Sequence, residues 1–332
     1  MAASAASACR RLADVSAMPD SATPLVSVVV PTHNRPGLLR EALASIAAQT
    51  CTDWEVVVVD DGSTPPIDAA ELEAVVNGRL RLVRHDQPRG VAAARNSGFA
   101  AARGELIAQL DDDDRLAPEA LSAAAAALRD ADVTFLGVSA FGDEADDVNL
   151  RQRSATRRTL RLAGASAGND ECVITFDDRL FAALLLGVPA AFQHPVFRRT
   201  ALDAVSPMGN DHWPESAWAL EAAARGLRCV LVDRPLYQWR RDGQSYFSQA
   251  ALASRMHEHD VEMKRALFER LQPVLQAEHR RLLGRALGNA LFDRCWATQG
   301  AAPGFWRDFL RSLRLAPRAG HLALLLRRLR AD

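Results

Sequence analysis

Apolar and amphipathic stretches alternate along the first 140 residues of the chain. Short runs of β-branched and other apolar residues are each followed by a segment whose apolar positions recur at helical spacing, and Pro36 and Pro118 stand where two of these helices begin. Strands that are apolar throughout and alternate with helices are typical of a parallel sheet covered on both faces. We therefore predict an α/β fold with a mostly parallel sheet. Its strands fall at residues 26–30, 54–59, 80–84, 105–110 and 133–138, and its helices at 38–49, 71–76, 92–102 and 118–129.

The pattern is weaker after residue 138. Residues 139–175 show little periodicity and contain five arginines between Arg151 and Arg161, with no acidic residue among them. We expect the run from Arg151 to Arg161 to form a solvated surface loop. The alternative is a loop that binds phosphate and becomes ordered over a bound substrate. Order resumes from residue 180, with strands at 229–232 and 237–240, and the chain after residue 249 has the pattern of helices. Residues 1–22, rich in alanine and serine, are expected to form a disordered tail.

Composition argues against several classes of protein. The 332 residues carry 40 basic and 41 acidic side chains, so the net charge of −1 gives no general electrostatic attraction to nucleic acid. The longest uncharged apolar stretch, residues 180–192, is too short to cross a membrane as a helix. The five cysteines are far apart and form no CxxC pair, which indicates reduced thiols in a cytoplasmic protein.

Polar and acidic residues follow three of the predicted strands. Pro31-Thr32-His33-Asn34 follow the first strand, Asp60 and Asp61 the second, and Asp111 to Asp114 the fourth. Because ligands of parallel α/β sheets bind outside the carboxyl ends of the strands, these residues mark a candidate site. Four adjacent carboxylates repel one another unless a cation lies among them, and oxygen ligands favour Mg²⁺ or Mn²⁺. The alternatives are a solvated acidic loop at 111–114 and ordinary turn or helix-cap chemistry at 60–61.

Four sequence blocks resemble the family 2 glycosyltransferases. In chain order they are residues 26–35, 55–63, 89–98 and 103–114, with Pro118 after the last. The resemblance implies a Rossmann-like GT-A fold, a nucleotide-sugar donor that is usually UDP-linked, a divalent metal, and inversion at the sugar. It also implies roles for single residues. Pro31, Thr32 and Asn34 would line the nucleoside pocket, Asp60 would contact the base beside Asp61, Arg95 would lie near the nucleotide, Asp112 would approach the ribose, and Asp111 and Asp113 would form the metal-binding DxD pair.

A catalytic base is expected at the start of the helix that ends in Arg225-Gly226. The family commonly carries Glu-Asp there, whereas this sequence has Pro214-Glu215. We predict that Glu215 takes the proton from the acceptor hydroxyl, with Asp211 as the second candidate. The alternative is that Glu215 only stabilises the N-terminus of its helix. Nearby, His194 is either an acceptor-site residue or a structural histidine, and Asp242 stands where relatives often carry a histidine.

The predicted function is that of an inverting, metal-dependent glycosyltransferase. It moves a sugar to an acceptor hydroxyl on a glycan or lipid-linked molecule, as in polysaccharide or glycoconjugate synthesis. Two alternatives are a non-catalytic protein that binds nucleotide-sugars as a sensor or scaffold, and a metal-dependent nucleotidyltransferase. We expect the nucleotide-sugar-binding half at 23–138, the acceptor-binding half at 139–248 and a helical region at 249–332.

The last 32 residues are basic, with seven arginines against two aspartates. Arginines occupy one side of a predicted helix, and Trp306, Phe309, Leu310 and Leu313 share another. This pattern predicts one of two arrangements. The helix either contacts the anionic inner face of a membrane peripherally, or packs on the body of the protein with its arginines exposed to solvent.

Overall fold

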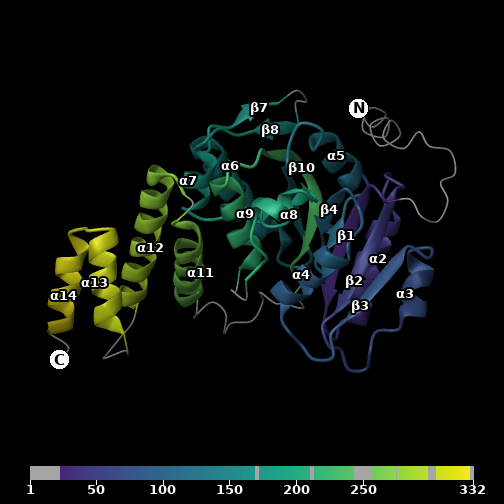
Figure 1. The fold of residues 1–332 in the computed structure, drawn as a ribbon, viewed down its shortest axis with the longest axis horizontal. Coiled ribbons are helices and arrows are strands. Elements are labelled where there is room, and N and C mark those ends of the chain that lie inside the picture. Colours follow the sequence, from purple (N-terminus) through teal and green to yellow (C-terminus); the bar gives the residue numbers. More distant parts are fainter. Residues whose placement is uncertain are drawn as a thin grey trace.

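The predicted apolar strands assemble into one ten-stranded sheet in the computed structural model, which describes residues 23–168, 172–209, 213–242, 256–273, 275–297 and 304–329 (Figure 1). β1 (Val26–Thr32) lies between β2 (Trp54–Asp60) and β4 (Leu106–Gln109), and β3 (Leu80–Arg84) pairs with β2 at the edge of the sheet. These four strands run parallel. Their carboxyl ends therefore meet along one edge, as the sequence predicts.

The second part of the sheet mixes strand directions. β9 (Val196–Arg198) runs antiparallel between β4 and β6 (Val133–Phe141), and β10 (Cys229–Arg240) runs parallel to β6. The two strands predicted at 229–232 and 237–240 are thus one strand, interrupted by register shifts on either side of Pro235. The boundary expected after residue 138 falls inside β6. The short strands β5 (Arg115–Leu116), β7 (Ser166–Ala167) and β8 (Val173–Thr175) pair antiparallel at the periphery.

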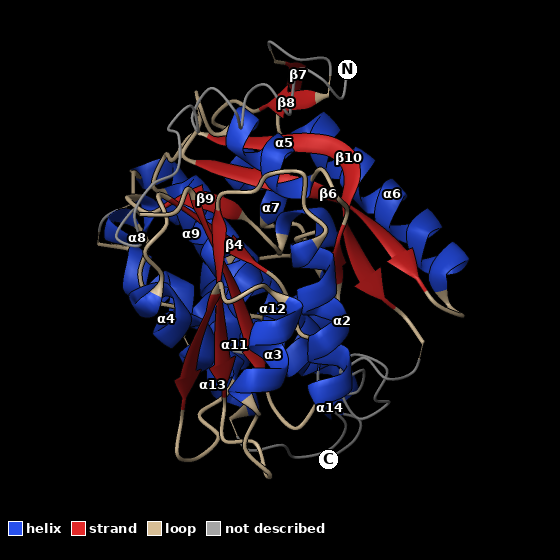
Figure 2. Ribbon diagram, turned by 90° about the vertical axis from the view of Figure 1, so that its right-hand side faces the viewer, coloured by secondary structure: helices blue, strands red, loops and turns tan. Residues whose placement is uncertain are grey.

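Helices cover both faces of the sheet, because successive strand residues point to opposite sides (Figure 2). Val28 and Val30 pack in one buried cluster with α2 (Pro36–Ala47), α3 (Ala69–Val75) and α5 (Ala120–Ala127). Val29 packs in the other with α4 (Val91–Ala101), α7 (Leu180–Leu184) and α9 (Pro214–Ala224). The predicted α/β class is therefore confirmed, and α4 and α9 share the face from which the candidate site is built. Two short elements, η1 (Ala190–Phe192) and α8 (Ala201–Ala204), flank β9.

The arginine-rich run from Arg151 to Arg161 lies in a helix, so the loop expected there is wrong, whereas all five arginines are exposed, as expected for a solvated surface. α6 (Ala145–Leu162) buries Val148 and Thr159, whereas its arginines lie on more exposed faces. Its inward side mixes apolar residues with small and polar ones, so the apolar pattern does not show the helix clearly. The Asn149 side chain ties α6 to β6 by accepting a hydrogen bond from the Ala140 N–H at 2.7 Å.

The described residues after 255 form four helices, in the region where the sequence predicts helices (Figure 1). α11 (Met256–Leu271) packs on α9, and α12 (Ala277–Ala297) packs between α11 and α13 (Phe305–Leu315), with α14 (Gly320–Leu329) outermost. None of the described helices is both long enough and apolar enough to span a bilayer. The predicted tail at 1–22 and the expected boundary at 248–249 lie outside the described residues.

Candidate active site

One buried arginine joins two carboxylates from distant parts of the chain. Arg95 of α4 is 1% exposed, and its Nη2 donates a hydrogen bond to Asp111 Oδ1 at 2.5 Å. Its Nη1 donates to Glu215 Oε1 in the first turn of α9. Burial opposes the charge of Arg95, but the two carboxylates raise its pKa further above its usual value. The side chains of Asp111 and Glu215 remain 28% and 16% exposed, so both are accessible to a substrate.

A second arginine binds the middle of the acidic run. Arg35 Nη1 lies 3.3 Å from Asp112 Oδ1 and 3.2 Å from Asp113 Oδ2. Thr32, at the end of β1, donates its hydroxyl to Asp112 Oδ2 at 2.7 Å. The structure thus brings the predicted nucleoside-pocket and ribose residues into contact. Arg35 is a site residue that the sequence analysis did not single out, although it lies within the first resemblance block.

Burial and mutual repulsion shift the pKa values of the aspartates at 111–113. Burial raises the pKa of Asp112 to about 6, and burial together with the charges of Asp111 and Asp112 raises the pKa of Asp113 to about 7. Burial also acts to raise the pKa of Asp111, but Arg95 outweighs it and the net shift is downward. A divalent cation among these oxygens would relieve the repulsion that raises the pKa of Asp113.

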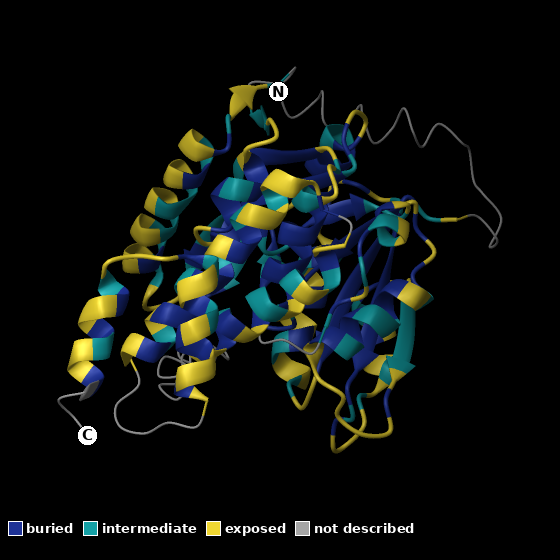
Figure 3. Cartoon of the chain, turned by 60° about the vertical axis from the view of Figure 1, so that its left-hand side comes forward, coloured by how far each residue is buried: buried dark blue, intermediate teal, exposed yellow. Residues whose placement is uncertain are grey.

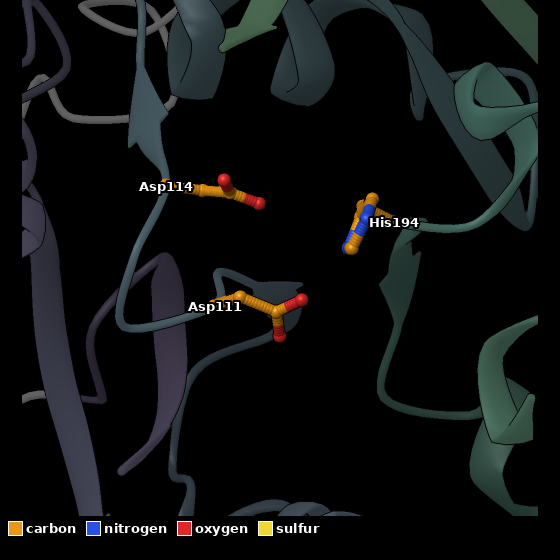
Figure 4. Close-up of side chains that lie close together, drawn as sticks. All are labelled: Asp111, Asp114 and His194. Carbon is orange, nitrogen blue, oxygen red and sulfur yellow. The ribbon is translucent and has the colours of Figure 1, made fainter. Parts of the chain in front are cut away.

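Asp114 and His194 lie close to Asp111 (Figure 4). Asp114 accepts hydrogen bonds from the Tyr237 hydroxyl at 2.7 Å and from the Arg240 N–H at 2.8 Å. The His194 ring stacks on Tyr237, with ring centroids 4.1 Å apart and planes 12° apart. Potential ligand atoms of Asp111, Asp114 and His194 all lie within 4.8 Å of one another. Burial lowers the pKa of His194 despite Asp111 and Glu215, which favours the neutral imidazole.

Asp60 and Asp61 are held by their own chain. Asp60 accepts hydrogen bonds from the Ser63 N–H at 2.8 Å and from Arg84. Asp61 accepts from the N–H groups of Arg89 and Gly90 at 2.9 Å and 2.8 Å, and Nδ1 of His85 lies 2.7 Å from it. Asp60 thus makes the local turn contact of the alternative. Asp61 instead binds the segment that leads into α4. Contact of either residue with the nucleotide stays a prediction.

Asn34 joins the loops that follow β1 and β2. Its backbone is left-handed, with φ of 56°, and its side-chain Oδ1 accepts a hydrogen bond from the Thr64 N–H at 2.7 Å. Pro31 is buried in β1 just before this turn. The loops expected to line the nucleoside pocket are thus fixed to one another.

Glu215, the first candidate base, lies at the N-terminus of α9. Glu215 is the second residue of α9, directly after Pro214, so it can both stabilise the helix N-terminus and face Arg95. Asp211, the second candidate base, lies outside the described residues. Asp242 accepts a hydrogen bond from Arg240 Nη1 at 2.9 Å at the end of β10.

Comparison with known proteins agrees with this geometry. Residues 27–184 match the protein family described as Glycosyl transferase family 2. The O-antigen biosynthesis protein RfbC of Myxococcus xanthus is 40% identical over 114 residues, which are 32% of this chain. The same stretch is 9% of RfbC, so the match spans a small part of that relative's length.

Two solved glycosyltransferase structures share the architecture. S. aureus TarS 1–349 in complex with UDP-GlcNAc has a TM-score of 0.57 at 19% identity, covering 91% of this chain and 92% of its own. The mannosyltransferase PcManGT of Pyrobaculum calidifontis, in complex with GDP-Man and Mn²⁺, has a TM-score of 0.52 at 21% identity, covering 97% and 92%. These likenesses confirm the predicted GT-A fold.

Proposed function

Since residues 27–184 belong to glycosyl transferase family 2, we propose that the chain transfers a sugar from a UDP-sugar to an acceptor hydroxyl, with inversion at the anomeric carbon. The acceptor is a glycan or lipid-linked glycan of a cell-surface polysaccharide or glycoconjugate. The names of RfbC and of the TarS complex, with O-antigen biosynthesis in one and UDP-GlcNAc in the other, support this class of reaction.

The observation that carries the proposal is the guanidinium shared by Asp111 and Glu215. Asp111 follows a central strand at the edge where α/β sheets bind ligands, and Glu215 lies across Arg95 from it. An acceptor hydroxyl beside Glu215 is therefore next to a donor diphosphate held near Asp111. An in-line displacement requires a base close to the group that binds the diphosphate, and Glu215 and Asp111 meet this requirement because they share Arg95.

Each residue then has a defined part in the transfer. The Glu215 carboxylate accepts the proton of the acceptor hydroxyl, and the hydroxyl oxygen attacks the anomeric carbon. The bond from that carbon to the diphosphate breaks, and the nucleoside diphosphate leaves. Arg95 holds the carboxylates in place and supplies positive charge beside the diphosphate. Thr32 lines the nucleoside pocket, and its hydroxyl orients Asp112, which binds the ribose.

The residues fit a divalent cation. Asp111 and Asp113 provide carboxylate oxygens. Burial raises the pKa of Asp113, and the negative charges of Asp111 and Asp112 raise it further, so a cation would stabilise its charged form. We propose that these two residues hold Mg²⁺ or Mn²⁺. When bound, such an ion neutralises the diphosphate and stabilises it as a leaving group.

Calorimetric titration tests the proposal directly. UDP, GDP and dTDP are each titrated into the chain with Mn²⁺ and again with EDTA, and we expect UDP to bind only with Mn²⁺. Asp113→Ala abolishes this metal-dependent binding. Asp130→Ala, which removes an exposed carboxylate after α5, leaves it intact.

Absence of binding by every nucleotide contradicts the proposal. UDP-sugar binding without transfer to any acceptor favours the scaffold alternative, and pyrophosphate release from a nucleoside triphosphate favours a nucleotidyltransferase.

We further propose that α13 and α14 contact an anionic membrane surface. Trp306, Leu310 and Leu313 of α13 are 48%, 61% and 40% exposed, and Leu322 of α14 is 63% exposed. Phe309, predicted to share their face, is buried instead against α12 and α14. The exposed apolar stripe of α13 adjoins exposed arginines, an arrangement typical of helices that lie in a membrane interface.

A further inference from the structure

His194 has a ring nitrogen without a partner. Its Nδ1 is sealed from solvent, and no described group donates to it or accepts from it. Buried polar atoms in proteins are almost always paired, so the arrangement calls for a ligand that the chain itself does not supply. Stacking on Tyr237, at 4.1 Å between ring centroids, fixes the plane of the imidazole.

The sheet places this imidazole beside Asp111. β4 and β9 pair antiparallel with Ala108 opposite Val196, so the residues just after β4 lie across from those just before β9. Figure 4 shows the carboxylates of Asp111 and Asp114 and the ring of His194 directed toward one shared space. Both oxygens of Asp114 already accept hydrogen bonds, one from Tyr237 and one from the Arg240 N–H. His194 Nδ1 and the Oδ2 atom of Asp111 thus remain available to a new ligand, whereas Asp111 Oδ1 already accepts a hydrogen bond from Arg95.

We propose that His194 is a direct protein ligand of the divalent cation, together with Asp111. This inference rests on the proposed function, which supplies the cation. An imidazole nitrogen is a softer ligand than a carboxylate oxygen, whereas Mg²⁺ prefers oxygen and keeps its water. His194 therefore biases the site toward Mn²⁺ and other transition metals over Mg²⁺.

Pulsed electron paramagnetic resonance of the full chain loaded with Mn²⁺ and UDP tests the ligand directly. A nitrogen bonded to Mn²⁺ modulates the electron spin echo, and we expect this modulation in the natural chain. His194→Asn removes it and weakens Mn²⁺ binding about tenfold or more, with a smaller change for Mg²⁺. His257→Asn is the matched control, because His257 is an exposed histidine of α11 outside the candidate site. It keeps the modulation.

The outcomes separate this inference from the proposed function. Mn²⁺ that binds the natural chain without nitrogen modulation overturns the role of His194 and leaves the metal-dependent transferase standing. Failure of Mn²⁺ to bind at all contradicts the proposed function itself. The experiment on the natural chain needs no variant, so it stays decisive if His194→Asn does not fold.

Discussion

A substitution at Glu215 distinguishes its proposed role as the catalytic base from a purely structural role at the N-terminus of α9. Glu215→Gln keeps the size of the side chain and removes its capacity to take a proton. We expect turnover to fall by about 10²- to 10⁴-fold, the range typical of a lost general base. UDP binding with Mn²⁺, measured by calorimetry, should remain, because the donor-side carboxylates are untouched.

Glu73→Gln serves as the control, since Glu73 is exposed on α3, far along the chain from the candidate base. It should keep the natural turnover. If Glu215→Gln also keeps natural turnover and only lowers the melting temperature, then Glu215 acts as a stabiliser of the α9 N-terminus, and the base must be sought elsewhere.

At this scale the sequence predicts which residues gather, but not how they pair. Asp111 and Glu215 are separately identifiable, one from a strand end and one from its distance to Arg225-Gly226. Arg95 was expected near the nucleotide, but its contact with both carboxylates could not be predicted, because 120 residues separate Arg95 from Glu215 and only the packing of α4 beside α9 brings them together. The approach of His194 to Asp111 depends on β9, a strand of three residues that carries too little pattern to give its register.

Among the elements, α4 depends on an unusually close approach to the sheet. A Cβ atom placed on Gly98 would lie 2.3 Å from Cγ1 of Val29 on β1, well inside van der Waals contact. Gly98→Ala must push α4 away from β1, and Arg95 lies one turn earlier on the same helix. We expect the free energy of unfolding to fall by about 1–3 kcal/mol, measured by urea denaturation, as in other overpacked cores.

Gly37→Ala is the matched substitution, because Gly37 also lies in a helix, α2, but has no neighbouring atom within 4 Å of the added Cβ. Alanine favours the helix over glycine, so this variant should be neutral or slightly more stable. Equal stability of the two variants would show that α4 moves without cost and that its distance from β1 is not fixed.

The sequence predicted the elements best where they are buried throughout. β1 and β2 are buried at every position, and their apolar runs show it directly. The sequence analysis did not predict α6, because the residues that face inward at helical spacing are mostly polar or small. These are Val148, Gln152, Ala155 and Thr159. For such a helix the amphipathic signal is weak, since tertiary packing and not side-chain polarity decides which face turns inward.

Over the whole molecule, the candidate site and the exposed apolar stripe belong to separate packing units. The site lies where the two large buried clusters of the sheet meet its carboxyl edge, whereas α13 and α14 pack with the end of α12 in a small cluster of their own. In Figure 3 the helix nearest the C-terminus carries exposed residues along its length. Substitutions in the stripe should therefore leave donor binding unchanged, which makes the two proposals separable by experiment.

The membrane proposal is tested by flotation of the full chain with vesicles. We expect the chain to float with phosphatidylcholine vesicles that contain phosphatidylglycerol, and less with phosphatidylcholine alone, because arginines adjoin the stripe. Replacing Trp306, Leu310 and Leu313 together by glutamine should abolish flotation, whereas glutamine at the equally exposed Leu150 of α6 should not. Sedimentation of both proteins without lipid supplies the deciding comparison. If the triple variant floats normally but loses self-association shown by the natural chain, the stripe is a contact between copies of the chain, and the membrane proposal is wrong.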